Sequence, residues 1–160
     1  MAPDAKLRLA EIVPETNVVP ELKATKKETA IKELVAALAA AGCIPKAKAK
    51  EVTEAALARE KLGSTGIGRG IAVPHVKVPW IAKPVGALGK ADAGIDFASL
   101  DAGLTRSVFL FVSPSETPEM HVALMSRFVT LIRKPDFVNF LAQTNGRKEL
   151  HDFLKEVDEW

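Results

Sequence analysis

Apolar residues recur at helical spacing in the first part of this chain. The first series consists of Ile31, Leu34, Val35 and Leu38. The segment Thr25-Lys26-Lys27-Glu28 before it has a capping-box pattern, and Gly42 after it suits the left-handed end of a helix. We therefore predict a helix between these two signals. A second helix is predicted from Pro45 to Leu62, with Gly63 at its end.

The last third of the chain has the same periodicity. Thr117-Pro118-Glu119 combines a helix cap, a proline suited to the first helical position and an acidic first turn. The apolar residues that follow at helical spacing are Val122, Leu124, Met125, Phe128, Val129 and Leu131. His121 falls in the first turn of this predicted helix. Two more helices are predicted, from Pro135 to about Ala142 and from Arg147 to about Val157.

Short apolar runs lie between the two helical regions, bounded by Gly, Pro, Asp or Ser as strands often are. They cover Gly70–Val73, Val85–Leu88 and Val108–Val112, and Asn17–Leu22 is an earlier candidate. The order of strand, two helices, several strands and further helices favours one α/β domain, bordering on α+β, in which helices flank a sheet. Periodicity does not reveal the strand directions.

Length and charge fit a single globular domain. A chain of 160 residues can bury most of its apolar surface without disulfides or metals. We expect one domain over residues 1–160, with residues 1–6 as a flexible tail. The formal net charge of +2 is too small to argue for nucleic acid, so no nucleic-acid partner is expected. The basic residues Lys46, Lys48 and Lys50 are predicted to lie on a solvated helix face.

Membrane and redox signals favour an ordinary intracellular protein. No apolar run approaches the length that crosses a bilayer, and no apolar stretch follows the charges at the N-terminus. A cytoplasmic location is therefore expected. The single cysteine, Cys43, excludes an intramolecular disulfide and fits a reducing compartment. We expect this residue to be packed rather than catalytic.

The segment from Arg59 to His75 is the strongest candidate for chemistry. Its glycines, Ser64 and Thr65 come before a short apolar run that ends on His75. Glycines let backbone N–H groups approach an anion, hydroxyls add donors, and a histidine offers a nitrogen nucleophile or a base. This layout suits a phosphoryl group. The same residues also fit a purely structural role, as a tight turn followed by a partly buried histidine.

Two nucleotide-binding motifs do not fit this segment. A Walker loop needs Lys and then Ser or Thr after its last glycine, whereas Arg69 and Gly70 follow Gly68. A dinucleotide fingerprint needs a preceding strand and G-x-G-x-x-G spacing. Here a helix is predicted before the loop, and the glycines are Gly66, Gly68 and Gly70. Nucleotide binding is therefore not predicted.

The sequence Arg59-Glu60 followed by Gly-Ser-Thr-Gly-Ile-Gly and Gly-Ile-Ala-Val-Pro-His closely resembles a known active-site signature. It is that of the enzyme IIA component of the phosphoenolpyruvate-dependent sugar phosphotransferase system, in its mannitol, fructose and nitrogen-regulatory type. The resemblance continues in Lys27-Glu28-Thr29-Ala30-Ile31, in Gly94-Ile95-Asp96-Phe97 before the Leu100-Asp101 turn, and in His121, and thus covers nearly the whole chain. The fold expected is a single domain with a central mixed β-sheet flanked by helices.

The resemblance implies roles for individual residues. His75 becomes phosphorylated, His121 is its neighbour in the active site, and Arg59 is the cation beside the phosphoryl group. The loop amides supply further donors, and the phosphoryl-binding residues expected there are Gly63, Ser64, Thr65, Gly66 and Gly68. No metal or cofactor is implied, because a neutral histidine has a nitrogen lone pair that attacks phosphorus directly. Cations and N–H donors then stabilise a charge-rich, loose transition state.

The residues alone leave other roles open. Arg59 fits equally well as a surface cation at the end of its own helix, and His121 as a solvated first-turn residue. His151, on an amphipathic terminal helix, is expected to be exposed. The chain departs from the family pattern at Val76, where a small residue is frequent. It departs also at Trp80, which suits either a partner anchor or a lid over the core.

A further departure is the segment Asp101–Arg106, which replaces the more usual Asp-Gly turn of the family and affects partner contacts more than chemistry.

The function implied by the resemblance is that of a phosphocarrier. His75 accepts a phosphoryl group from an HPr-like histidine phosphocarrier protein and passes it to a cysteine on a separate enzyme IIB in sugar uptake. This chain has no IIB module, because Cys43-Ile44-Pro45 is not part of a phosphate-binding loop. Peripheral association with a membrane transporter would run through IIB and IIC. The alternatives are a nitrogen-type regulator whose phosphorylation state controls partner binding, or a binding module without phosphotransfer.

Overall fold

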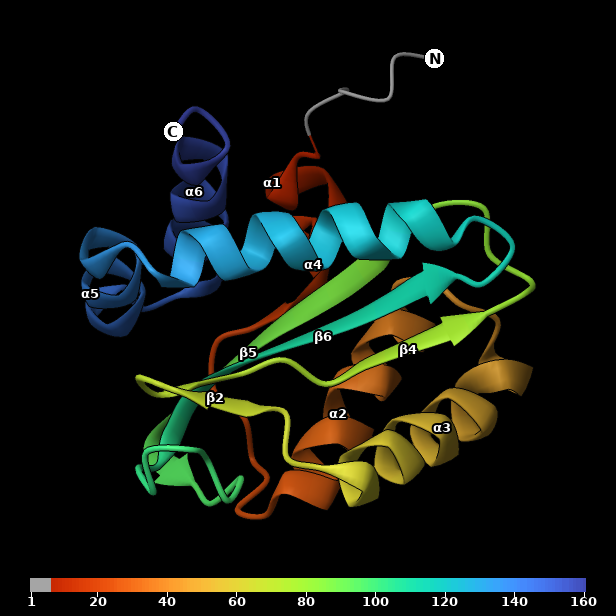
Figure 1. Ribbon diagram of the computed structural model, residues 1–160, viewed down its shortest axis with the longest axis horizontal. Helices are drawn as coiled ribbons and strands as arrows, with labels where there is room; N and C mark the ends of the chain where they lie inside the picture. The colour runs from red at the N-terminus through yellow and green to blue at the C-terminus, as the bar shows by residue number, and fades with distance from the viewer. Residues whose placement is uncertain (1–6) are drawn as a thin grey trace.

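α-Helices cover both faces of a mixed six-stranded sheet in the computed structural model, which describes residues 7–160 (Figure 1). The predicted α/β class with a central mixed sheet is confirmed. The tail expected over residues 1–6 lies outside the described residues.

The sheet is built around its two longest strands, β5 and β6. In chain order the elements are α1 (Leu9–Ile12), the 3-10 turn Glu15–Asn17, β1 (Val18–Val19), α2 (Lys27–Ala40), the 3-10 turn Lys46–Lys48, α3 (Ala49–Leu62), β2 (Gly66–Gly68), β3 (Ile71–Ala72), β4 (His75–Val78), β5 (Val85–Ile95), β6 (Thr105–Pro114), α4 (Pro118–Ile132), α5 (Pro135–Gln143) and α6 (Arg147–Val157). The strand order is β1-β5-β6-β3-β2, and β4 continues beyond β3 along β6. β1 is parallel to β5, and β3 and β4 are parallel to β6. The pairs β5-β6 and β2-β3 are antiparallel.

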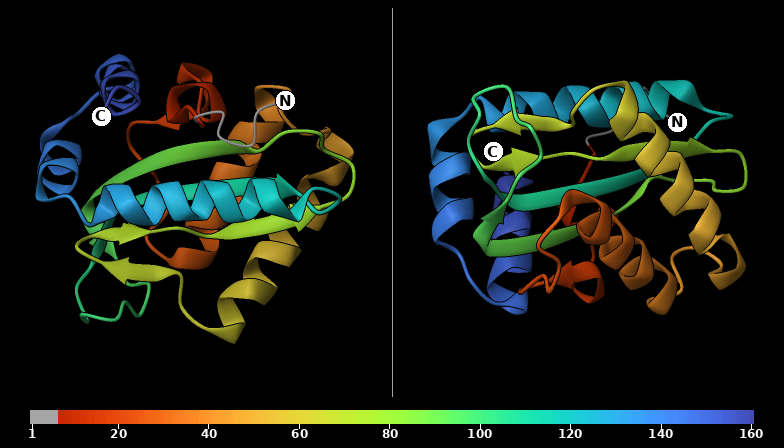
Figure 2. Two further views of the ribbon diagram at one scale, coloured as in Figure 1. Left: turned by 45° about the horizontal axis from the view of Figure 1, so that its top comes forward. Right: turned by 90° about the horizontal axis from the view of Figure 1, so that it is seen from below.

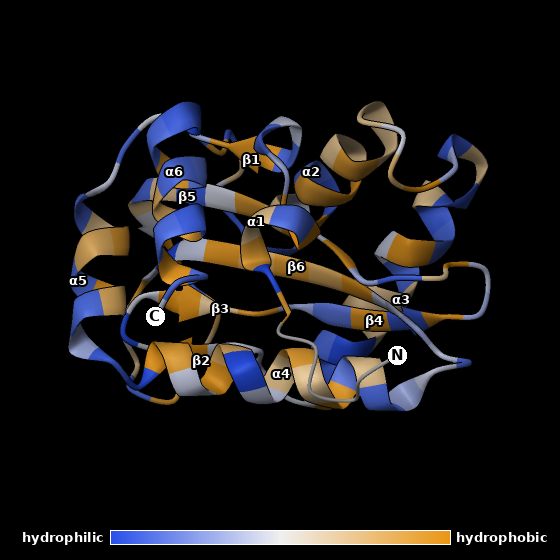
Figure 3. Ribbon diagram, turned by 90° about the horizontal axis from the view of Figure 1, so that it is seen from above, coloured by the Kyte–Doolittle hydropathy of each residue, from blue (hydrophilic) through white to orange (hydrophobic). Residues whose placement is uncertain are grey.

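The two faces of β6 belong to two separate hydrophobic clusters. Val108, Leu110 and Val112 pack with residues of α2 and α3, below the sheet in Figure 1. Phe109 and Phe111 pack with residues of α1, α4, α5 and α6 on the other face. A strand that is covered on both faces is apolar at successive positions rather than alternately, as the colouring of β6 in Figure 3 shows. The views in Figure 2 show helices on each side of the sheet.

The helices are close to the predicted ones, with three corrections at their starts. α2 begins at Lys27, and within the described residues no side chain caps it, so the capping box predicted from Thr25 is not formed. Pro45 does not begin α3. Its carbonyl accepts a hydrogen bond from the Lys48 N–H (2.9 Å), which closes a 3-10 turn, and α3 starts only at Ala49. α4, α5 and α6 confirm the three predicted C-terminal helices, and Pro118 begins α4, but the Thr117 side chain makes no capping hydrogen bond.

The strands differ more from the predictions. β5 and β6 extend well beyond their apolar runs, whereas only Val18–Val19 of the run Asn17–Leu22 forms a strand. Neither β2 nor β4 was predicted, because three or four residues are too few for a hydrophobic period to be recognised. None of the helices formed by residues 7–160 combines the length and hydrophobicity that a bilayer crossing requires.

Candidate active site

A cavity of about 320 Å³ lies where α3, β4 and α4 meet. It is lined by Ala55, Arg59, His75, Val76, Lys77 and His121. The three predicted catalytic residues, Arg59, His75 and His121, are therefore brought together from three different elements. This is the one place in the described part of the chain where two histidine rings come close, with centroids 5.3 Å apart.

The position of His75 follows from an interruption between two strands. β3 and β4 both pair with β6, and the regular strand pairing is interrupted between them at Val73 and Pro74. The Pro74 carbonyl accepts the Phe111 N–H at 3.0 Å. β4 then resumes with His75 opposite Phe111. Strand alternation puts His75 and Lys77 on the face of α4 and buries Val76 in the core on the opposite face. Val76 also lines the cavity, so the departure there places a buried apolar side chain directly beside the histidine.

A backbone contact determines which nitrogen of His75 keeps its lone pair. Its Nδ1 lies 2.8 Å from the Val73 carbonyl oxygen, which only accepts hydrogen bonds. Nδ1 must therefore carry the proton, and Nε2 keeps its lone pair. Burial, assisted by Arg59 and Lys77, lowers the pKa of His75 below its ordinary 6.5. The ring is thus neutral at physiological pH.

His121 lies in the first turn of α4, as predicted from its place after Pro118, and its ring contacts β6. Its Nδ1 lies 3.1 Å from Oγ of the buried Ser113. Burial, with His75 and Lys77 as smaller causes, lowers the pKa of His121 to about 4. His121 is therefore a neutral ring beside His75 at physiological pH and not a cation.

Positive charge at the cavity comes from two residues. Arg59, in the last turn of α3, donates from Nη1 to the Gly63 carbonyl at 2.9 Å, so the helix-end role considered for it is also realised. Lys77 is an exposed lining residue that the sequence analysis missed. The signal that could have found it is its position two residues after His75, which places both on one face once β4 is recognised as a strand.

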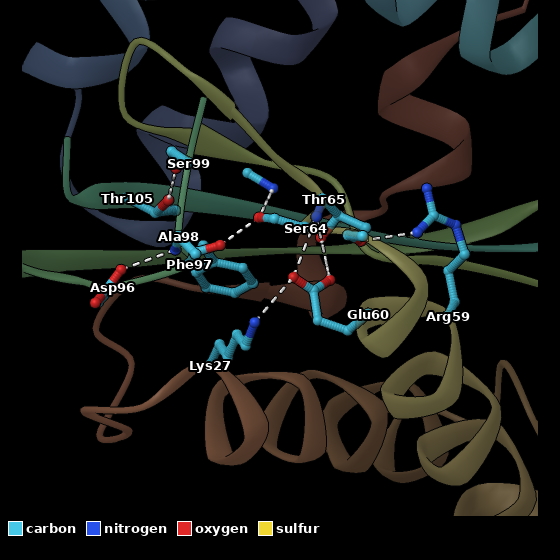
Figure 4. A network of polar contacts seen from close by, with 12 residues as sticks. Lys27, Arg59, Glu60, Ser64, Thr65, Asp96, Phe97, Ala98, Ser99 and Thr105 are labelled. Carbon is cyan, nitrogen blue, oxygen red and sulfur yellow. Dashed lines mark hydrogen bonds and ion pairs between the residues drawn. The ribbon is translucent and has the colours of Figure 1, made fainter. Parts of the chain in front are cut away.

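The hydroxyls of the glycine-rich segment are engaged elsewhere (Figure 4). Ser64 donates to the Phe97 carbonyl and accepts the Gly66 N–H at 2.9 Å. Thr65, which is 3% exposed, donates from Oγ1 to Glu60 at 2.6 Å and from its N–H at 3.1 Å. These bonds fix the chain between α3 and β2. They leave neither side chain among the residues that line the cavity.

The glycines have close neighbours of their own. A Cβ at Gly66 would lie 2.4 Å from Ser99 Oγ, and one at Gly68, whose φ is +90°, would lie 3.1 Å from an Asp101 carboxylate oxygen. Of the five described loop residues expected to bind phosphoryl, none lines the cavity. Phosphoryl contact by Gly63, Ser64, Thr65, Gly66 and Gly68 stays a prediction, and their observed contacts are structural.

Glu60 is a second residue whose importance the sequence analysis missed. It is 5% exposed and points away from Arg59, its neighbour in α3 (Figure 4). Its carboxylate is bonded to Thr65 and lies 3.5 Å from the Lys27 ammonium of α2. Lys27 and Glu60 both fall in the segments that carry the family resemblance, but their mutual contact depends on how α2 packs on α3.

Trp80, Cys43 and His151 were also singled out in the sequence, and their contacts are as follows. Trp80 packs on the core and donates from Nε1 to Glu51 at 2.8 Å, which favours the lid over the partner anchor. Cys43 packs partly buried against the core, as predicted. The expectation that His151 is exposed is wrong: it is half-buried, with Nε2 3.0 Å from the Ala10 carbonyl, because α1 packs on α6.

A family model described as "Phosphoenolpyruvate-dependent sugar phosphotransferase system, EIIA 2" matches residues 11–157. The chain belongs to this family. This EIIA 2 domain is 31% identical over 146 residues to a nitrogen regulatory protein of Bradyrhizobium diazoefficiens, a match that covers 91% of this chain and 94% of that protein. The family as a whole serves phosphotransfer, so a general phosphotransferase-system role follows for the domain.

Solved structures share the fold of this EIIA 2 domain. The nitrogen regulatory protein IIA-Ntr from Neisseria meningitidis superimposes with a TM-score of 0.81 at 23% identity, covering 91% of this chain and 97% of that one. IIA mannitol from Escherichia coli, solved in complex with phosphorylated IIB mannitol, gives a TM-score of 0.69 at 23% identity, with coverages of 89% and 96%.

Proposed function

We propose that this EIIA 2 domain is a phosphocarrier that accepts a phosphoryl group on Nε2 of His75 from an HPr-like phosphohistidine protein and passes it to a partner protein. The observation that carries this proposal is the 2.8 Å contact between His75 Nδ1 and the Val73 carbonyl. It leaves the Nε2 lone pair available on a residue that shares a cavity with Arg59, Lys77 and His121.

The transfer is a substitution at phosphorus. The Nε2 lone pair of His75 forms a bond to phosphorus while the bond between phosphorus and the donor nitrogen breaks, and the donor ring keeps that electron pair. No proton has to leave His75, because Nδ1 stays protonated against the Val73 carbonyl throughout. Onward transfer to an acceptor nucleophile, such as a cysteine thiolate, is the same kind of step: the acceptor forms the bond to phosphorus, and Nε2 of His75 is the leaving group.

The neighbours stabilise the charge of the transferring group. Arg59 and Lys77 supply positive charge at the cavity. We assign the Ser113 hydroxyl as donor to His121 Nδ1, across their 3.1 Å contact. His121 then carries its proton on Nε2 and offers an N–H to a phosphoryl oxygen, which suits a histidine whose pKa of about 4 keeps it neutral.

The nitrogen that carries the phosphoryl group tests this mechanism. The domain is phosphorylated with phosphoenolpyruvate, enzyme I and the histidine carrier protein, and the ring nitrogens of His75 are assigned by ¹⁵N NMR. A phosphorus-coupled Nε2 with a protonated Nδ1 is expected. Phosphorylation at Nδ1 would contradict the mechanism. Absence of uptake from several active carrier proteins would instead favour a binding module without phosphotransfer.

Two acceptors are supported by different observations. The complex of the related IIA mannitol with phosphorylated IIB supports a relay, in which a separate enzyme IIB cysteine takes the group in sugar uptake. The nearly full-length match to a nitrogen regulatory protein supports a switch, in which the phosphorylation state of His75 controls binding to regulatory targets. A cytoplasmic location and association with a transporter through IIB and IIC stay predictions.

Discharge of the phosphorylated domain separates the two acceptors. In a relay, a purified IIB protein removes the phosphoryl group within seconds to minutes, and a IIB variant without its cysteine does not. In a switch, the group persists in the presence of IIB, while a kinase, transporter or transcription factor binds only one of the two phosphorylation states in a titration.

A further inference from the structure

A continuous line of hydrogen bonds joins α2 and α3 to the ring of His75. Glu60, buried at the end of α3, receives the N–H and the hydroxyl of Thr65 at 3.1 and 2.6 Å. The Thr65 carbonyl accepts the Val73 N–H at 3.0 Å. The carbonyl of the same Val73 accepts Nδ1–H of His75 at 2.8 Å. Two residues, Thr65 and Val73, thus lie between Glu60 and the ring.

The inner members of this line are shielded from water. Glu60, Thr65 and Val73 are 5%, 3% and 5% exposed. Buried hydrogen bonds of this kind have no water to replace them, so each one restricts the position of the next. Lys27 closes the line at its far end, 3.5 Å from the Glu60 carboxylate and with its side chain 25% exposed. In Figure 4, Lys27 and Thr65 approach the carboxylate from opposite sides.

We infer that Glu60 and Thr65 are positioning residues for His75, which hold the Val73 carbonyl where it fixes the Nδ1–H tautomer and so presents Nε2 for phosphoryl transfer. This inference rests on the proposed function of His75. In a neutral histidine either nitrogen can hold the proton, and the partner of one nitrogen decides. A shift of the Val73 peptide therefore changes the tautomer as well as the orientation of the ring.

The two residues of the signature Arg59-Glu60 then have different roles. Arg59 faces the cavity, whereas Glu60 points into the core and fixes the start of β2. The positioning role also explains why the hydroxyl of Thr65 is not free for a phosphoryl group, because its contact with Glu60 is part of the support of His75.

Thr65→Val tests the inference, since it removes the 2.6 Å hydroxyl contact and nearly preserves the shape of the side chain. Two quantities are measured in the full chain: the tautomer of His75 by ¹⁵N NMR, and the phosphorylation rate as a function of donor carrier concentration. We expect a smaller Nδ1–H fraction and a maximal rate lower by about tenfold, with an unchanged half-saturating donor concentration. Thr65→Ser, which restores the hydroxyl, should recover both.

Thr53→Val is the matched control. Thr53 lies within α3, and its hydroxyl donates to the Ala49 carbonyl at 2.9 Å, away from the line to His75. It should behave as wild type. A folded Thr65→Val protein with the wild-type tautomer and rate would overturn the inference, as would equal losses in Thr53→Val.

Lys27→Met supplies the test if Thr65→Val does not fold, because Lys27 lies only partly buried at the far end of the line. A change of tautomer in this variant supports the inference, and an unchanged tautomer overturns it. The tautomer measurement needs no phosphoryl donor. A wild-type protein that takes up no phosphoryl group would therefore refute the proposed function, while the tautomer comparison still decides the role of Glu60 and Thr65.

Discussion

His75 and His121 are two neighbouring rings with different partners and a common electrostatic environment. Burial lowers the pKa of both, and the cations beside the cavity act in the same direction. Both rings are therefore neutral where phosphoryl transfer operates. For His75 neutrality preserves the lone pair on Nε2, and for His121 it preserves an acceptor on Nδ1 for the Ser113 hydroxyl.

The lowered pKa of His121 makes stability depend on pH. The unfolded chain binds a proton at His121 with a pKa near 6.5, whereas the folded protein does so near 4, so the unfolded state holds more protons between these values. The free energy of unfolding is expected to fall as the pH decreases from about 6.5 to about 4. We expect His121 to contribute on the order of 1–2 kcal/mol after solvent screening.

Urea unfolding of wild type and His121→Asn across this pH range measures the effect. His121→Asn should show the smaller loss of stability on acidification, although His75 still contributes to it. Equal pH dependence in the two proteins would show that His121 is not the group responsible.

Arg59 is expected to matter through the transition state of phosphoryl transfer. Arg59→Ala should lower the maximal rate of phosphorylation by about 100-fold, because one charge-stabilising donor is lost. Arg59→Lys keeps the positive charge but loses the planar guanidinium, so its rate should lie between those of wild type and Arg59→Ala. Lys50→Ala, an exposed cation on the same helix, is the control. Rapid-quench measurements of the phosphorylation rate test these variants. Equal rates for Arg59→Ala and Lys50→Ala would contradict the role of Arg59 in stabilising the transition state.

At this scale the sequence predicts residues that belong to a recognisable pattern. Arg59, His75 and His121 were identified through the family resemblance, and the structure brings them to one cavity. Lys77 was missed, since it becomes a neighbour of His75 only through the pairing of β4 with β6. The partners of Ser64 and Thr65 could not be predicted, because they depend on tertiary contacts that local patterns do not encode.

Among the elements, the long helices were the most predictable because a period of 3.6 is repeated over several turns. Gly42, with φ +77°, ends α2 in the manner its sequence suggests: its N–H and that of Cys43 bond back to the Ala39 and Leu38 carbonyls at 3.1 and 3.0 Å. The strands β2 and β3 contain only three and two residues, and they form because β3 finds a pairing partner in β6 and β2 finds one in β3.

Gly42 and Gly63 provide a comparison of two helix ends. A Cβ at either position would meet no atom within 4 Å, but only Gly42 has a left-handed φ, whereas φ of Gly63 is 161°. Gly42→Ala should therefore lower the free energy of unfolding by about 1–2 kcal/mol. Gly63→Ala should change it by less than about 0.5 kcal/mol. Chemical denaturation measures both, and similar costs at the two sites would contradict the backbone argument.

Across the whole molecule, the two ends of the described chain are tied together. Asp158, fully buried after α6, accepts the Leu9 and Ala10 N–H groups of α1 at 2.6 and 2.9 Å. α1 and α6 lie side by side in Figure 1 and on the same face of the sheet as α4. The short α1 had no periodic signal, because it is stabilised by a residue almost 150 positions away.

Removal of this tie should destabilise the fold. Asp158→Ala leaves two N–H groups of α1 without their acceptor and is expected to lower the free energy of unfolding by about 2–3 kcal/mol. Glu159→Ala removes only an exposed ion pair with Arg8 and should therefore cost much less stability than Asp158→Ala. Thermal and urea unfolding measure both variants. An unchanged free energy of unfolding in Asp158→Ala would show that α1 does not depend on this contact.

The intact mass after incubation with phosphoenolpyruvate, enzyme I and the histidine carrier protein tests the central claim most directly. Wild type should gain one acid-labile phosphoryl group, His75→Ala should gain none, and His151→Ala should gain one like the wild type. An unphosphorylated wild type with several active carrier proteins, or a His75→Ala variant that still gains the group, would contradict the assignment of His75 as the phosphoryl acceptor.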